Sequence, residues 1–186
     1  MIAGYQRYGR SLAAHMDGLG LVNDRFTVAH GVWLDDDDMK RLGDRGASVA
    51  HNPGSNMRLG SGFADVRGML NAKVNVGIGT DGASCSDNQN VYEAIRLTSF
   101  ASKVQGPDHE SWVTTEEALK AATEGGARAL GLAGQIGRIA PGYKADLVFL
   151  DLTHINYVPL NETLYHVVFV EDGSSLGGGV YFTRHA

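Results

Sequence analysis

The sequence lacks several features that mark common classes of protein. It contains one cysteine, Cys85, so no disulfide can form within the chain, and a reducing compartment fits. No apolar run approaches the roughly 20 residues that a membrane-spanning helix needs. The N-terminal residues have neither the basic start nor the apolar core of a secretory signal peptide. We therefore expect a cytoplasmic protein without a membrane partner.

Positive charge is also scarce. The chain has 16 Lys and Arg against 21 Asp and Glu, a net charge of -5, and no basic stripe. Nucleic acid is therefore not expected as a partner. The composition is that of a folded protein, with 43% hydrophobic and 20% charged residues over 186 positions. This length suffices for one domain with a sizeable core, or for one domain with a small appendage.

Helical and extended patterns alternate over the first 130 residues. The patterns predict helices over residues 5–19, 35–46, 64–72, 91–104 and 114–130, and short apolar strands over residues 26–29, 47–50 and 74–79. This alternation is typical of a parallel sheet whose two faces are covered. The three strands lead to His30, His51 and Asp81, and chemistry in such folds lies at the carboxyl ends of strands.

The pattern changes after Gly131. We predict strands over residues 134–138, 145–150 and 167–170, separated by turns, and no helix. The chain is therefore divided into a domain of residues 1–132 and a small β unit of residues 133–186. Three βα units cannot close a barrel of eight strands, so we expect either assembly with further copies or a piece of a larger protein.

Asp81 and His30 are the strongest candidates for chemistry. A buried carboxylate must be paired, hydrogen-bonded or metal-bound, because an unpaired buried charge is too costly. Asp81 is thus either a turn residue before Gly82 or a metal ligand that also accepts a proton from metal-bound water. His30 is either a core histidine or part of the same site.

A second group of candidates lies in the segment AHNPGSN. His51 has the same two interpretations as His30. Ser55 and Asn56 follow the turn that Pro53 and Gly54 mark, and they either cap this loop or contact a ligand.

Four segments in order resemble the amidohydrolase superfamily. They read TVAHGVWLDDDDM, GASVAHNPGSNMRLGSG, VNVGIGTDGASCSDNQNVYEAIRL and IGRIAPGYKADLVFLDL. The similarity extends from about Tyr8 to Ser175 and is nearest to the branch of cytosine, guanine and S-adenosylhomocysteine deaminases, which also contains triazine hydrolases. It implies an α/β fold: the C-terminal portion of a (β/α)8 TIM-like barrel, about strands 6–8, followed by part of a small β-sandwich.

The resemblance also implies roles for individual residues. Asp81 matches the strand-8 aspartate, which is a metal ligand and moves the proton. His30 matches the strand-6 histidine, which lies near the metal-bound water and the substrate. His51, Ser55 and Asn56 lie in the strand-7 turn, where we expect contacts with substrate. The implied cofactor is one divalent metal, zinc, with iron as the alternative.

Other ligands of that family are missing from this chain. The motifs His-x-His and His-x-x-Glu, which hold the metal together with the aspartate, do not occur in the sequence. We therefore expect a fragment that is metal-poor and inactive by itself. We also expect the end GGGVYFTRHA to be truncated or altered by a change of reading frame.

The function implied is hydrolytic deamination of an aminated N-heterocycle (nucleobase, nucleoside or pterin-like) by metal-activated water. Such an enzyme is a hydrolase acting on carbon–nitrogen bonds other than peptide bonds. Two alternatives remain open: a triazine-type chlorohydrolase of the same superfamily, and a non-catalytic half-barrel that serves assembly. The unpaired strand edges of a half-barrel predict that the isolated chain aggregates or oligomerises, and we expect the full-length form to be a homo-oligomer.

Overall fold

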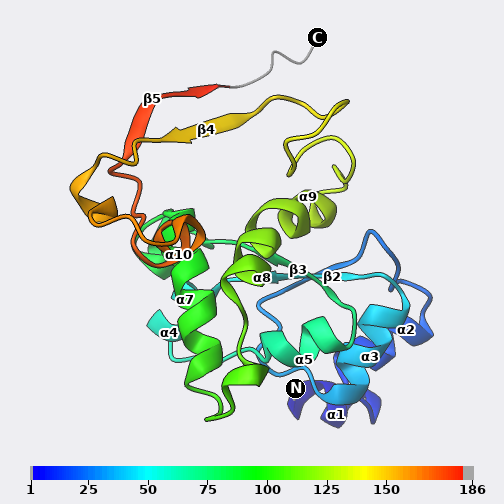
Figure 1. Cartoon of the computed structure of the whole chain (residues 1–186). Helices are drawn as coiled ribbons and strands as arrows, with labels where there is room; N and C mark the ends of the chain where they lie inside the picture. The colour runs from blue at the N-terminus through cyan, green and yellow to red at the C-terminus, as the bar shows by residue number, and fades with distance from the viewer. Residues whose placement is uncertain (1, 182–186) are drawn as a thin grey trace.

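The protein contains two separate sheets and a series of mostly short helices. A computed structural model describes residues 2–181 (Figure 1). The strands are β1 (Thr27–Ala29), β2 (Ser48–His51), β3 (Asn75–Ile78), β4 (Leu147–Leu150) and β5 (Leu176–Tyr181). The helices are α1 (Ile2–Tyr8), α2 (Leu12–Gly18), α3 (Asp36–Asp44), α4 (Pro53–Arg58), α5 (Val66–Asn71), α6 (Ala83–Ser86), α7 (Val91–Lys103), α8 (Thr115–Lys120), α9 (Gly126–Ala129) and α10 (Thr163–Phe169), with shorter helical turns η1 (His109–Ser111), η2 (Ala121–Gly125) and η3 (Ile155–Tyr157).

The first sheet is parallel and has the order β1-β2-β3. Its register aligns Val28 with Val49 and Val49 with Val76. The side chains of Val49 and Val76 are buried in one core with residues of α3, α5, α7 and α8. The predicted strands over residues 26–29, 47–50 and 74–79 are therefore confirmed, and their carboxyl ends meet at one edge of the sheet.

The segment from α8 to α9 packs closely against β3. Thr114 and Glu117 form the capping box that starts α8, as the sequence predicts. The helix then widens into the π-helical turn η2 and ends in α9. A Cβ atom at Gly125 would overlap the carbonyl oxygen of Val76, so only glycine permits this approach of η2 to the strand.

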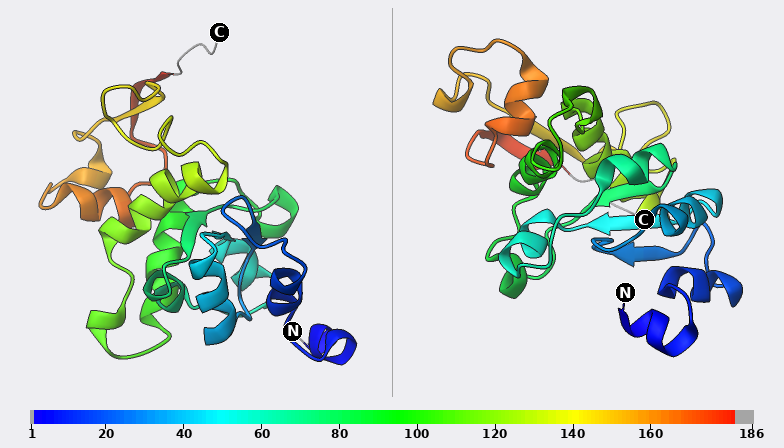
Figure 2. Two further views of the ribbon diagram at one scale, coloured as in Figure 1. Left: turned by 90° about the vertical axis from the view of Figure 1, so that its right-hand side faces the viewer. Right: turned by 90° about the horizontal axis from the view of Figure 1, so that it is seen from below.

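The second sheet is an antiparallel pair formed by β4 and β5. Figure 1 shows it at one end of the molecule, apart from the parallel sheet, and the left view of Figure 2 agrees. Val148 and Phe149 of β4 are each 51% exposed.

None of the helices within residues 2–181 is long and apolar enough to cross a membrane.

Four expectations for the secondary structure are wrong. The segment after Gly131 does contain helices, namely η3 and α10. The segment 167–170 is not a strand, because it lies mostly in α10, where Leu164 and Val168 share the face that packs into the core. Residues 134–138 form turns and bends instead of a strand. The single helix over residues 5–19 is two helices, because Gly9 has a positive φ of 65° and Ser11 caps α2.

Helix α10 also joins the two parts of the chain. It packs against α7 and α8, and Val168 is fully buried. A helix from the predicted second unit thus contributes to the core of the first. The division at residues 132 and 133 stays a prediction.

Candidate active site

Asp81 and His30 lie at the carboxyl edge of the parallel sheet. His30 follows β1 and Asp81 follows β3 after two further residues. Both have left-handed backbone conformations, with φ of 66° and 61°. Such conformations are uncommon for residues other than glycine and cluster at functional sites. The atoms His30 Nε2 and Asp81 Oδ2 are 3.7 Å apart, and both side chains remain partly exposed.

Two hydrogen bonds hold the carboxylate of Asp81. The hydroxyl of Ser55 donates to Oδ2 over 2.7 Å, and the backbone N–H of Gly82 donates to Oδ1 over 2.7 Å. The pKa of Asp81 lies below its ordinary value despite partial desolvation. The hydrogen bond from Ser55 lowers it most, followed by the hydrogen bond from Gly82 and then by the charge of His30. Asp81 is therefore ionised at neutral pH.

The short helix α4 supplies the partners of both residues. It carries Ser55, which contacts Asp81, and Asn56, whose Oδ1 lies 2.8 Å from His30 Nδ1. Pro53 occupies its first turn, where the fixed φ of proline favours helix formation. Both Ser55 and Asn56 are buried. The sequence indicated a turn in this segment, whereas the structure forms a short helix that carries the partners of Asp81 and His30.

His51 is not brought to the pocket. Its side chain is 1% exposed and lies on the same face of β2 as Val49, which is buried in the core. Neither ring nitrogen has a hydrogen-bond partner among the described residues. Burial, and then the charge of His30, lowers the pKa of His51 to about 4, so its ring is neutral.

An open pocket of about 720 Å³ adjoins the Asp81–His30 pair. Its polar end contains Asp81, His30, Ser55 and Asn56, and its remaining wall is largely apolar, including Leu12, Met16, Phe26, Val32, Trp33, Leu34 and Leu59. A mostly apolar pocket with a few converging polar groups is typical of small-molecule sites. Sequence reasoning missed this apolar wall. The position of Trp33, three residues after His30, is a signal that could have indicated it.

The residues present do not complete a metal site. Among the described residues, no group of three or more His, Cys, Asp or Glu side chains could hold a metal ion. Asp81 and His30 offer two donors, whereas a hydrolytic zinc site normally has three protein ligands. The donor set of residues 2–181 is therefore a partial one.

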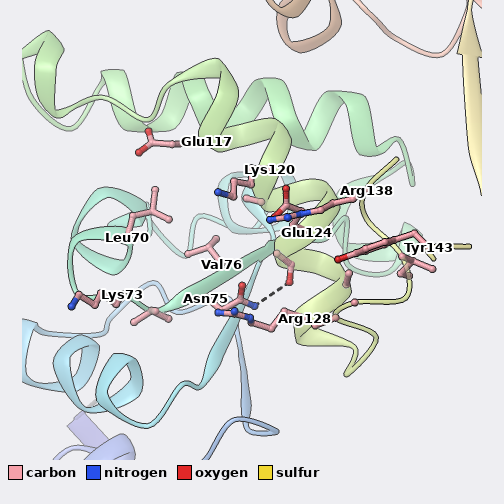
Figure 3. Close-up of a pocket in the computed structure, with 17 residues that line it drawn as sticks. Leu70, Lys73, Asn75, Val76, Glu117, Lys120, Glu124, Arg128, Arg138 and Tyr143 are labelled. Carbon is pink, nitrogen blue, oxygen red and sulfur yellow. Dashed lines mark hydrogen bonds and ion pairs between the residues drawn. The ribbon is translucent and has the colours of Figure 1, made fainter. Parts of the chain in front are cut away.

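A second pocket, of about 620 Å³, lies beside the N-terminal end of β3 (Figure 3). Lys73, Asn75 and Lys120 contribute to its lining. Asn75 donates a hydrogen bond to the carbonyl oxygen of Gly125 over 3.0 Å. This pocket contains neither Asp81 nor His30, so it is separate from the candidate active site.

The known proteins that this chain resembles include two deaminases and a chlorohydrolase. The 5-methylthioadenosine/S-adenosylhomocysteine deaminase of Pyrococcus abyssi is 39% identical over 175 residues, which cover 94% of this chain and 40% of the relative. A zinc-bound adenosine deaminase from Xanthomonas campestris matches with a TM-score of 0.92 and 34% identity over 97% of this chain and 41% of that chain. An atrazine chlorohydrolase from Arthrobacter aurescens complexed with zinc has a TM-score of 0.83 and 28% identity, over 89% and 36% of the two chains.

These matches agree on the family and on the extent of the similarity. The chain spans about 40% of the length of the curated relatives that it matches. The resemblance in the sequence motifs is confirmed, as is the α/β fold shared with these TIM-barrel-type hydrolases. Residues 2–177 match the description "Amidohydrolase family", and the chain belongs to that family.

Proposed function

We propose that the chain contributes one part of the active site of a metal-dependent deaminase that acts on an aminated N-heterocycle. The observation that carries this proposal is the pair of Asp81 and His30, 3.7 Å apart at the polar end of an apolar pocket. The curated relatives are named as deaminases of 5-methylthioadenosine and S-adenosylhomocysteine, and this favours a substrate with an aminopurine group.

The architecture proposed follows from the partial coverage of these relatives. Residues 1–132 would provide about strands 6–8 of a (β/α)8 barrel, and residues 133–186 would provide part of a β-sandwich. The remaining metal ligands would come from polypeptide outside these residues. We further propose a cytoplasmic location and a homo-oligomeric full-length form, which the sequence composition and the open strand edges support.

Asp81 is the residue of this chain that would hold a divalent metal, and zinc in related structures makes zinc the preferred choice. Such an ion supplies a water molecule of lowered pKa. Ionised Asp81 is suited to accept one proton and to return it to the leaving amine. His30 is suited to hydrogen-bond the reacting part of the substrate, and Ser55 keeps Asp81 in place.

The composition of the pocket supports the proposal of hydrolytic deamination. One water molecule replaces one amino group on a ring carbon, and ammonia leaves. A flat heterocycle is accommodated by apolar side chains such as Trp33 and Leu12, while the polar end receives the amino group. A chlorotriazine would satisfy the same shape, and a half-barrel without catalysis would need none of these features.

A chimera tests the proposal. The chain replaces the matching 40% of the Pyrococcus abyssi relative, and ammonia release from 5-methylthioadenosine and chloride release from atrazine are measured. We expect ammonia release, and we expect Asp81→Asn to reduce kcat by about 10²- to 10⁴-fold because a general acid–base group is lost. Asp87→Asn is the matched control, since Asp87 is exposed and pairs with Arg58 outside the pocket.

Three results would count against the proposal. Chloride release without ammonia release would favour the chlorohydrolase. A chimera that binds zinc but transforms neither compound would favour the assembly module. Equal activity of the Asp81→Asn and Asp87→Asn chimeras would remove the catalytic role of Asp81.

A further inference from the structure

The two tryptophans of the chain have different surroundings. The indole of Trp112 donates a hydrogen bond from Nε1 to the carbonyl oxygen of Gly106 over 2.9 Å, and Nζ of Lys103 lies 5.7 Å from the centre of its ring. Trp33 is 67% exposed, and its indole makes no hydrogen bond, ring stacking or cation–π contact within residues 2–181. The indole of Trp33 is therefore free to contact a ligand.

The apolar core determines where Trp33 lies. Trp33 belongs to the turn after β1, and its neighbours Val32 and Leu34 both pack against the core. Gly31 permits this packing, because it has a positive φ of 65° and a Cβ atom there would lie 2.9 Å from the side chain of Met69. The backbone on both sides of Trp33 is thus held in place, and the exposed indole extends from a supported turn.

The loop after α4 lies beside the indole. A Cβ atom at Gly62 would lie 3.5 Å from Cζ2 and 3.9 Å from Cη2 of Trp33, which is ordinary van der Waals contact. The backbone at Gly62 therefore passes next to the six-membered ring of the indole. Trp33 also lines the 720 Å³ pocket whose polar end contains Asp81 and His30. The indole is thus supported by backbone and adjoins the pocket.

We propose that Trp33 is a specificity-determining residue whose indole stacks on the face of a fused-ring heterocycle in this pocket. This inference deepens the proposed function and rests on it, because the amino group of that heterocycle would lie at the end formed by Asp81 and His30. Stacking gains free energy from each pair of ring atoms in contact. A purine, which has two fused rings as the indole does, overlaps more of the indole than a single ring does. Trp33 therefore selects a purine over a pyrimidine or a triazine.

Fluorine NMR tests the stacking contact directly. The chimera is labelled with 5-fluorotryptophan, and Trp33→Phe assigns the signal of Trp33. Trp112 is an internal control, because it does not line the pocket. We expect inosine to shift the Trp33 signal upfield through the ring current of the purine and to leave the Trp112 signal unchanged. An unchanged Trp33 signal at saturating inosine overturns the inference.

A second nucleoside tests the preference for a fused ring. Inosine and uridine share the same sugar, have no amino group to lose by hydrolysis, and differ in whether the base has two rings or one. We expect inosine to bind the chimera at least about 10-fold more tightly than uridine does, because stacking contributes strongly to the affinity for a base. Equal affinities overturn the preference for a fused ring.

Kinetics of the chimera separate stacking from simple apolar contact. We expect Trp33→Leu to raise KM for 5-methylthioadenosine by about 10- to 100-fold with little change in kcat, because a stacked ring is bound equally before and during the reaction. Trp33→Phe keeps an aromatic face and should raise KM by less than about 5-fold. Leu19→Ala is the matched control, because Leu19 is an exposed apolar residue outside the pocket. An unaltered KM in Trp33→Leu contradicts the inference.

The results also separate this inference from the proposed function. A chimera that releases ammonia from 5-methylthioadenosine while its Trp33 signal ignores inosine retains the proposed function and overturns the role of Trp33. A chimera that releases no ammonia but whose Trp33 signal shifts with inosine supports the role of Trp33 while the proposed function fails.

Discussion

The two sheets of this molecule are stabilised in different ways. In the parallel sheet, the side chains of Val49 and Val76 are at most 3% exposed and belong to an apolar core built from several helices. In the β4–β5 pair, Val148 and Phe149 are half exposed. A two-stranded pair is marginal by itself in water. The comparison indicates that the first region has its own core and that the second depends on contacts outside its strands.

A buried polar cluster provides some of those contacts. The carboxylate of Glu171 is fully buried and accepts hydrogen bonds from the hydroxyls of Tyr157, over 2.6 Å, and Ser175. The backbone N–H of Gly173 donates to the same carboxylate over 2.6 Å. Arg96 of α7 donates to the backbone oxygen of Glu171 over 2.8 Å, which ties this cluster to the first region.

The largest expected effect lies in the apolar core. Met69 is fully buried, and Met69→Ala should lower the free energy of unfolding by about 2–5 kcal/mol through lost burial and a cavity. Val148→Ala removes a half-exposed side chain from β4 and should cost less than about 1 kcal/mol. Urea unfolding followed by circular dichroism compares them. Similar losses for both variants would break the distinction between the two regions.

The polar cluster should produce a smaller and local effect. Burial raises the pKa of Glu171, but the bonds from Ser175, Tyr157 and the backbone outweigh it, so the pKa lies below its ordinary value. The stabilisation is therefore complete above the unfolded pKa of about 4.3 and is lost as the pH falls through the folded value. Glu171→Gln should remove this acid sensitivity and cost about 1–2 kcal/mol at neutral pH.

Hydrogen exchange at the backbone N–H of Asp151 measures this effect. This N–H donates to the backbone oxygen of Ser175 over 2.7 Å. We expect faster exchange at Asp151 in Glu171→Gln, while amides of β2 and β3 stay protected. Glu116→Gln is the matched control, because Glu116 is exposed on α8. Equal opening of both sheets in Glu171→Gln would show that they unfold as one unit.

The same contrast explains which features could be predicted from the sequence. The strands ending at His30, His51 and Asp81 were predictable because apolar segments with helices between them have few alternative arrangements. The strand predicted over residues 167–170 was wrong because β-branched valines favour strands locally, whereas burial of Val168 against α7 and α8 favours the helix. The local strand or helix propensity of a segment does not reveal tertiary packing of this kind.

The site shows a similar division. The positions of Asp81 and His30 at the ends of strands indicated a shared site, and their approach to 3.7 Å agrees with that prediction. The sequence could not show that Ser55 and Asn56 lie at the pocket while His51 does not. A short strand that leads directly into a helix does not reveal which of its residues face the core. Only the register of β2 places His51 in the core and the two helix residues at the pocket.

Zinc content tests the central claim most directly. After dialysis, the chimera should hold about one zinc per molecule, as should its Asp87→Asn control, whereas Asp81→Asn should lose most of it because a ligand is missing. The 186-residue chain by itself should hold far less than one zinc, since it offers only a partial set of donors. Full zinc retention in the Asp81→Asn chimera, or one tightly held zinc in the chain alone, would contradict the account.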